Sequence, residues 1–195
     1  MFWLDERLFF LINGLAERST AFDSIMTFMV SDYFTPLIMT MVVLALWFQG
    51  NDAAERERTH RAIFSTATAV GFACAVVKLM NLGIDRLRPF EAHPESVKLL
   101  FYTCTDPSFP SNSAAIAFAF AMGTWFINRR ASLFLFAVAV LWAFSRVYCG
   151  VHYPLDIVGG AAIGILIVWP AMWANRLVHW VPDWVHSALI RLHLA

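Results

Sequence analysis

Charged residues are scarce in this sequence, which has 195 residues and a charged fraction of 14%. Ordinary soluble domains carry about 25% charged residues. Hydrophobic residues make up 59% of the chain and its mean hydropathy is +0.62, so the composition excludes an ordinary soluble domain and indicates a membrane protein. The formal net charge is zero, which leaves no basic surface of the kind that binds nucleic acid.

The sequence also lacks linkers, low-complexity tails and internal repeats. A single membrane-embedded domain over residues 1–195 is therefore expected. The N-terminus has no basic region followed by a small-residue cleavage site, so we expect no cleaved signal peptide.

Cysteine is rare, and its three positions, Cys74, Cys104 and Cys149, show no metal-binding spacing. No group of His, Asp or Glu has ligand spacing either, so no metal and no cofactor are expected. Cys104 and Cys149 could both lie in loops on the same face, which leaves open whether they form a disulfide.

Long apolar stretches dominate what is present. A helix needs about 20 apolar residues to cross the hydrocarbon core of a bilayer. Five stretches reach or approach that length, and they lie at residues 29–49, 62–83, 111–128, 132–149 and 154–175. The expected fold is all-α, a polytopic membrane helix bundle with about five transmembrane helices.

Two shorter segments at the chain ends are predicted to lie at the membrane interface. In residues 2–15, apolar positions 4, 8, 11 and 15 share one helical face and charged residues lie opposite, which is typical of an interfacial helix. Residues 177–194 carry Trp180 and Trp184, the aromatic anchors common at membrane interfaces.

Arginines in the short loops predict the orientation. They cluster in residues 51–61 and 129–130 and recur at Arg176, and the positive-inside rule places these loops on the cytoplasmic side. Residues 85–110 and the segment around position 152 then face outside. Four cations oppose this assignment, and such cations would be kept outside to bind a ligand: Arg86, Arg88, Lys98 and Arg146.

The segment Ser-Arg-Val-Tyr-Cys-Gly-Val-His-Tyr-Pro-Leu-Asp (145–156) carries the clearest chemistry. His152 has Asp156 four residues after it and Arg146 six before it. An imidazole oriented by a carboxylate is a nucleophile or a general base, and a guanidinium binds phosphate in bidentate fashion. Polar residues at membrane depth are costly and usually functional, which disfavours an incidental interfacial histidine. The pattern predicts phosphate chemistry at a membrane surface.

Two more segments are expected on the same face. Arg86 and Arg88 precede Pro89, and on their own they would also fit arginines that snorkel to the interface. The run Ser111-Asn112-Ser113 opens a predicted helix; such a run caps the helix, and the same free amides can bind an anion.

Together these residues resemble the type 2 phosphatidic acid phosphatase superfamily. Its signature is a lysine seven residues before Arg-Pro, then Pro-Ser-x-His, then Ser-Arg-x5-His-x3-Asp, and the third motif is complete here. Over nearly the whole chain the sequence is similar to one branch, the bacitracin-resistance undecaprenyl-diphosphate phosphatases. The matching stretches are Leu-Ile-Asn-Gly (11–14), Asp23, Arg-Pro-Phe-Glu-Ala-His-Pro (88–94), Ser-Phe-Pro-Ser (108–111), Ala-Phe-Ala (117–119) and residues 145–156.

Two positions depart from the family pattern. The lysine position is Asn81, with Lys78 one helical turn earlier as a candidate substitute. The histidine of Pro-Ser-x-His, which in the family protonates the leaving group, is Ser113 here. Serine does not donate that proton near neutral pH. The sequence leaves open whether Ser113 is natural or introduced, and His93 is a second candidate proton donor, although an exposed loop histidine is its plainer interpretation.

The resemblance implies that His152 attacks the terminal phosphorus and that a phosphohistidine is then hydrolysed. Asp156 would orient His152, while Arg88, Arg146 and the amides near Ser111 would hold the phosphate. It further implies a polyprenyl diphosphate substrate in a bacterial inner membrane, with the site facing the periplasm or the outside. A phosphatase of lipid phosphomonoesters and a weakly active lipid-phosphate-binding pseudophosphatase are the alternatives. Oligomeric state is left undetermined.

Overall fold

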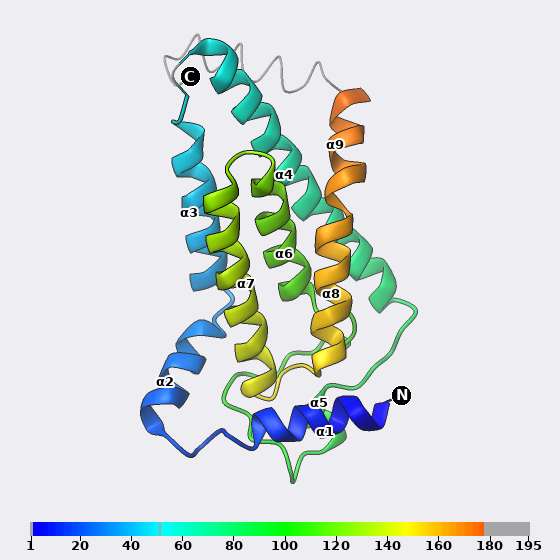
Figure 1. The fold of residues 1–195 in the computed structure, drawn as a ribbon. Coiled ribbons are helices and arrows are strands. Elements are labelled where there is room, and N and C mark those ends of the chain that lie inside the picture. The colour runs from blue at the N-terminus through cyan, green and yellow to red at the C-terminus, as the bar shows by residue number, and fades with distance from the viewer. Residues whose placement is uncertain (1, 51, 178–195) are drawn as a thin grey trace.

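The computed structural model describes residues 2–50 and 52–177, and these residues form helices and no strands. The predicted all-α class is therefore confirmed. In chain order the helices are α1 (Phe2–Asn13), α2 (Thr20–Met29), α3 (Phe34–Trp47), α4 (Ala53–Asn81), α5 (Pro89–Ala92), α6 (Asn112–Trp125), α7 (Arg129–Tyr148), α8 (Pro154–Leu166) and α9 (Val168–Leu177). Figure 1 shows α3, α4, α6, α7 and the α8–α9 pair running alongside one another, with α1 across one end.

Helix α6 lies at the centre of the bundle, where it packs against α4, α7 and α8 (Figure 1). Its buried positions are small, which lets neighbouring helix backbones approach closely. They include Ala114, Ala115, Ala117, Ala119 and Ala121.

Helix α8 crosses α6 at two glycines. A Cβ at Gly160 would lie 2.2 Å from the carbonyl oxygen of Ser111, and one at Gly164 would lie 2.3 Å from that of Ala115. The absence of a side chain at both positions allows the backbone of α8 to lie directly on that of α6. This contact brings the first turn of α8 beside the first turn of α6, where the site residues are.

The predicted spans correspond to helices, with three differences. The segment 51–61 was predicted to be a loop, but α4 already begins at Ala53, where Asp52 accepts a hydrogen bond from the amide of Glu55 at 2.7 Å. The loop prediction was wrong because that cap starts a helix in a polar sequence. The stretch 29–49 is divided, since α2 and α3 meet at a bend of 56°. The last stretch is also divided, into α8 and α9.

Length separates α6 from the longer helices. Three helices of the described residues are long and apolar enough to cross a membrane, or up to four if the bent pair α2–α3 counts as one span. Helix α6 has 14 residues, about 21 Å of helix, against a hydrocarbon core of about 30 Å. It corresponds to the predicted stretch 111–128 and lies inside the bundle.

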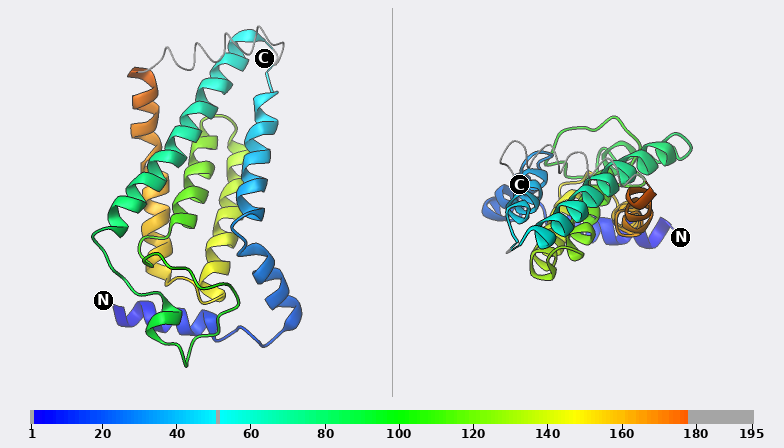
Figure 2. Two further views of the ribbon diagram at one scale, coloured as in Figure 1. Left: turned by 180° about the vertical axis from the view of Figure 1, so that it is seen from behind. Right: turned by 90° about the horizontal axis from the view of Figure 1, so that it is seen from above.

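The predicted N-terminal helix is α1, which runs across the end of the bundle where α7 ends and α8 begins (Figures 1 and 2). Its buried face carries Asp5, Phe9 and Asn13, whereas Leu4 and Leu11 are exposed. The Asn13 amide nitrogen donates to the carbonyl oxygens of Tyr148 and Lys98, each at 2.8 Å, which fastens α1 to the end of α7. The predicted helix at 177–194 lies outside the described residues apart from its first position.

Candidate active site

His152 lies in the turn between α7 and α8, with 3% of its surface exposed. Gly150 adopts a left-handed backbone with φ +83°, and a Cβ there would come within 2.9 Å of the carbonyl oxygen of Lys98. The carbonyl oxygen of Arg146 then accepts hydrogen bonds from the amides of Val151 at 2.9 Å and His152 at 3.3 Å. The turn therefore folds His152 back against the end of α7.

Asp156, in the first turn of α8, is completely buried. One carboxylate oxygen accepts hydrogen bonds from the Ser108 hydroxyl at 2.6 Å and from the Tyr153 amide at 2.8 Å. The other pairs with the Arg86 guanidinium at 2.5 Å. The carboxylate is thus fixed from several directions.

The structure brings His152 and Asp156 together, as the sequence predicted. His152 Nδ1 lies 3.6 Å from Asp156 Oδ2, which is longer than a hydrogen bond. At this distance from Asp156, the Nδ1 atom of His152 is buried and has no hydrogen-bond partner. Asp156 therefore faces one ring nitrogen and leaves the other, Nε2, directed elsewhere.

Nε2 of His152 faces the guanidinium of Arg88, at 3.3 Å from Nη1. Arg88 is 2% exposed and also pairs with Asp106 at 2.9 Å. Arg146, equally buried, forms an ion pair with Asp32. Within the described residues, Arg146 Nε and His152 Nδ1 are the buried side-chain nitrogens or oxygens that lack a hydrogen-bond partner. Both belong to the predicted site.

The surroundings of His152 favour its neutral form. Burial lowers the pKa of His152, and the charges of Arg88 and Arg146 lower it further, while Asp156 acts in the opposite direction. A neutral imidazole is the form that can attack phosphorus. The surroundings therefore favour the neutral imidazole over a charged binding group.

The first turn of α6 lies beside this cluster. Ser111 is the N-cap, and its hydroxyl accepts a hydrogen bond from the Ala114 amide at 3.4 Å. Its own amide donates to the Asp156 carbonyl at 3.0 Å, so that amide is committed to the protein. The amides of Asn112 and Ser113 follow it at the helix start, where amides have no intrahelical partner.

Three predicted auxiliary residues lie less centrally. The side-chain amide of Asn81, in its hydrogen-bonding orientation, donates to the carbonyl of Phe109 at 2.8 Å, so it supports the loop before α6. Lys78 is exposed on α4. His93 lies 4.0 Å from Glu6 and contacts the ring of Phe10, so its neighbours belong to α1.

Sequence reasoning gave no role to four side chains at the site. Asp5 pairs with Arg86 and Ser108 bonds to Asp156, while Asp106 pairs with Arg88 and Asp32 pairs with Arg146. Asp5 shares a helical face with Phe9 and Asn13, and this i, i+4, i+8 row is a signal that could have been found. Asp32 and Asp106 lie in irregular segments, where no periodicity points to a partner.

No group of three or more His, Cys, Asp or Glu side chains within the described ranges could hold a metal ion. The cysteines in these ranges are free thiols. Cys104 packs against the apolar cluster that contains the buried Cys149.

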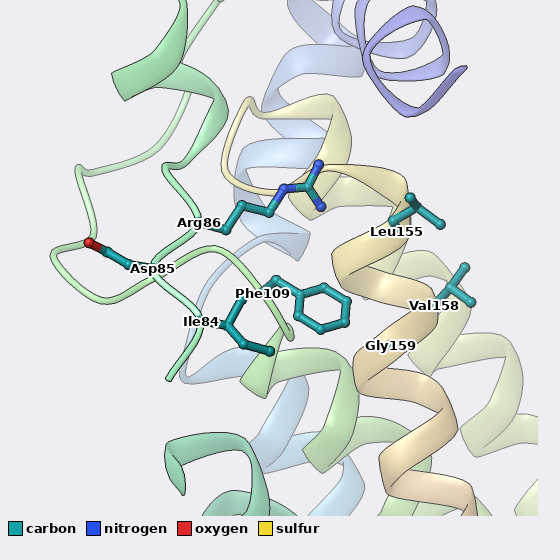
Figure 3. Close-up of a pocket in the computed structure, with 7 residues that line it drawn as sticks. All are labelled: Ile84, Asp85, Arg86, Phe109, Leu155, Val158 and Gly159. Atoms are coloured by element: carbon teal, nitrogen blue, oxygen red, sulfur yellow. The ribbon is translucent and has the colours of Figure 1, made fainter. Parts of the chain in front are cut away.

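An apolar cavity of about 630 Å³ is lined on its polar side by Asp85 and Arg86. Figure 3 shows Phe109 and Ile84 on one side and Leu155 and Val158 of α8 on the other. Two of these apolar residues are adjacent in sequence to polar residues of the site: Ser108 precedes Phe109, and Asp156 follows Leu155. The cavity therefore places apolar surface next to Arg86, the arginine that pairs with Asp156.

Comparison with known proteins defines the class. Residues 59–180, more than half of the chain, match the PAP2 superfamily, and the chain belongs to that family. The undecaprenyl-diphosphatase BcrC of Bacillus subtilis (strain 168) is 30% identical over 165 residues, which cover 84% of this chain and 80% of that protein. The putative undecaprenyl-diphosphatase YbjG of Escherichia coli (strain K12) is 32% identical over 190 residues, covering 93% and 90%.

A solved structure agrees with the sequence comparison. The crystal structure of Aquifex aeolicus LpxE has a TM-score of 0.63 at 27% identity and covers 87% of this chain and 94% of its own. The resemblance inferred from the motifs is therefore confirmed. The protein is an integral membrane lipid phosphatase of the PAP2 superfamily.

Proposed function

We propose that the protein hydrolyses undecaprenyl diphosphate to undecaprenyl phosphate and inorganic phosphate through a phosphohistidine. The geometry of His152 carries this proposal: Nδ1 faces Asp156 at 3.6 Å, and Nε2 faces Arg88 at 3.3 Å. A phosphoryl group held by Arg88 would lie in front of Nε2. The names of the two relatives supply the substrate.

The first step is in-line attack. His152 Nε2 forms a bond to the terminal phosphorus as the bond from phosphorus to the bridging oxygen breaks, and undecaprenyl phosphate leaves. Arg88 and Arg146 stabilise the charge on the equatorial oxygens, which is the main source of catalysis in phosphoryl transfer. The unsatisfied Nε of Arg146 is available for one more acceptor.

The second step is hydrolysis. Water attacks the phosphohistidine, the phosphorus–nitrogen bond breaks, and inorganic phosphate is released. Throughout both steps Asp156 holds the ring through its negative charge and supports the positive charge that develops on it.

Ser113 favours a diphosphate over a phosphomonoester. A monoester expels an alkoxide, so the absence of a general acid costs about 10²–10⁴-fold. A diphosphate expels a phosphate monoester, whose second pKa is about 6, so it can leave largely unprotonated. The half-buried Ser113 at the start of α6 is therefore tolerated best with a lipid diphosphate.

The apolar cavity supports a lipid substrate. It is lined by Arg86 together with the apolar side chains of Phe109, Leu155 and Val158 (Figure 3), where it offers a place for the first part of a polyprenyl chain.

The decisive assay compares phosphate release from undecaprenyl diphosphate and from phosphatidic acid by purified protein in detergent. We expect release from the diphosphate, little from the monoester, and none from His152→Ala. A protein that prefers the monoester would be the alternative lipid phosphomonoesterase. Lipid binding without release from either substrate would identify a pseudophosphatase.

We further propose that the site faces the periplasm or the outside in a bacterial inner membrane, because the arginines in 51–61 and 129–130 lie toward the opposite end of the bundle (Figure 1). Glu95 and Gln49 are both exposed. With native cysteines removed, Glu95→Cys should react with an impermeant thiol reagent in intact cells and Gln49→Cys should not. The reverse labelling would overturn this orientation.

A further inference from the structure

Arg86 joins α1 to the carboxylate that orients the candidate nucleophile. Its Nη1 lies 2.5 Å from Asp156 Oδ1, and its Nη2 lies 2.5 Å from Asp5 Oδ2. The side chains of Asp5 and Asp156 are 1% and 0% exposed, and that of Arg86 is 15% exposed. The three charges therefore form a buried row with one cation between two anions.

Asp5 is also fixed to α8 directly. Its second oxygen accepts a hydrogen bond from the amide of Leu155 at 2.8 Å, one residue before Asp156. The Arg86 guanidinium lies over the ring of Tyr153, 4.3 Å from its centroid. One carboxylate on α1 thus holds both the arginine that bonds Asp156 and the first turn of the helix that carries Asp156.

We propose that Asp5 and Arg86 are positioning residues that hold Asp156 toward His152 and balance its charge, so that α1 is part of the catalytic apparatus. This inference rests on the proposed phosphohistidine chemistry. Neither residue is assigned a contact with the substrate. Removing one partner of a buried ion pair leaves an uncompensated charge, so the row acts as a unit.

The row has an electrostatic consequence with a definite sign. Asp156 favours the protonated imidazole, Arg86 offsets Asp156, and Asp5 offsets Arg86. We therefore expect loss of Asp5 to lower the pKa of His152 and loss of Arg86 to raise it. Besides Asp156, Arg88 and Arg146 act on His152 directly. The charged or titratable groups next to those arginines and to Arg86 are Asp106, Asp32, Tyr102, Cys104, Cys149, Tyr153 and Glu6, and they are the same in every variant compared below.

The test is the pH profile of kcat/KM for phosphate release from undecaprenyl diphosphate. The acidic limb reports protonation of His152, and ionisation of the substrate cancels between variants. We expect the limb to move to lower pH in Asp5→Asn and to higher pH in Arg86→Gln. The double variant should return toward the wild-type limb, because one charge of each sign is removed.

Measuring kcat distinguishes the positioning of Asp156 by Arg86 from the effect of the charge of Arg86. We expect kcat to fall about 10-fold to 100-fold in either single variant, with KM nearly unchanged, which is the size of effect seen when a hydrogen-bond partner of a metal ligand is lost. Arg86→Lys keeps the charge but loses the planar fork. It should therefore keep the wild-type limb and still lose turnover.

Asp23→Asn is the matched control. Asp23 is a second N-terminal carboxylate that accepts a hydrogen bond, from the Tyr148 hydroxyl at 2.6 Å, but it is outside the row. This variant can lower the unfolding temperature without moving the limb. If Asp5→Asn and Arg86→Gln move the limb in the same direction, or leave it in place while folded, the positioning role is refuted. If the wild type releases no phosphate, the proposed function fails instead.

Discussion

The three arginines near His152 are held in two different ways. Arg86 lies between Asp5 and Asp156, whose side chains are at most 1% exposed. Arg88 and Arg146 pair with loop carboxylates, and those of Asp106 and Asp32 are 56% and 31% exposed.

Burial decides what each arginine can do. Breaking a fully buried pair by removing one partner costs about 3–5 kcal/mol, whereas a fully exposed pair contributes about 0–1 kcal/mol. The pairs of Arg88 and Arg146 lie between these limits, because each carboxylate reaches solvent and its arginine does not. We therefore expect an incoming phosphate to replace Asp106 and Asp32 rather than Asp5 or Asp156. The comparison distinguishes a positioning arginine from two arginines whose carboxylates are exchangeable.

Among these predictions, the largest effect is expected at Arg88 and Arg146, the two arginines whose carboxylate partners are exchangeable. Arg88→Gln and Arg146→Gln each remove a charged donor to the transferred phosphoryl group, and we expect kcat/KM for undecaprenyl diphosphate to fall about 10²-fold to 10³-fold. Steady-state phosphate release measures this, with unfolding temperature as the folding control. A folded variant that retains a third of the activity would place the phosphate elsewhere.

A gain of activity is expected at the start of α6. Ser113→His supplies a proton donor for the leaving oxygen, so turnover of phosphatidic acid should rise at least about tenfold, the lower part of general-acid magnitudes. The rise should be smaller for undecaprenyl diphosphate, whose leaving group needs less protonation. Equal gains on both substrates would show that position 113 does not serve the leaving oxygen.

The smallest effect is expected from the loop carboxylates. Asp106→Asn and Asp32→Asn remove competitors of the phosphate, so KM should fall about twofold to fivefold with kcat little changed. The expected change is on the order of the value of a solvent-exposed pair, because each carboxylate, unlike its arginine, reaches solvent. Tyr102 donates to Asp32, and this bond raises the pKa of Tyr102, so its hydroxyl remains a donor. A KM that rises in both variants would mean that these carboxylates help to bind substrate.

Much of this arrangement was predictable because it depends on local spacing. His152, Asp156 and Arg146 lie within one turn and its two flanking helix ends, so four- and six-residue separations bring them together. The capping role of Ser111 follows from its position before an apolar helix, and the structure confirms it. Apolar length located the helices, although it missed the polar first turns of α4.

The rest depends on contacts between distant segments. Asp5 and Asp156 are about 150 positions apart in sequence, and Arg86 bridges them only because α1 crosses the end of the bundle. Asp32 and Arg146 likewise come together through the bend between α2 and α3. The spacing of residues within one segment cannot predict a pairing between two distant segments.

The central claim is that His152 carries the phosphoryl group. Rapid quenching of the wild type with undecaprenyl diphosphate labelled in its terminal phosphate, followed by peptide mapping, tests it most directly. We expect acid-labile, base-stable label on the peptide that contains His152, and neither label nor phosphate release in His152→Ala. Label on another residue, or phosphate release by folded His152→Ala at more than a few per cent of the wild-type rate, would contradict the account.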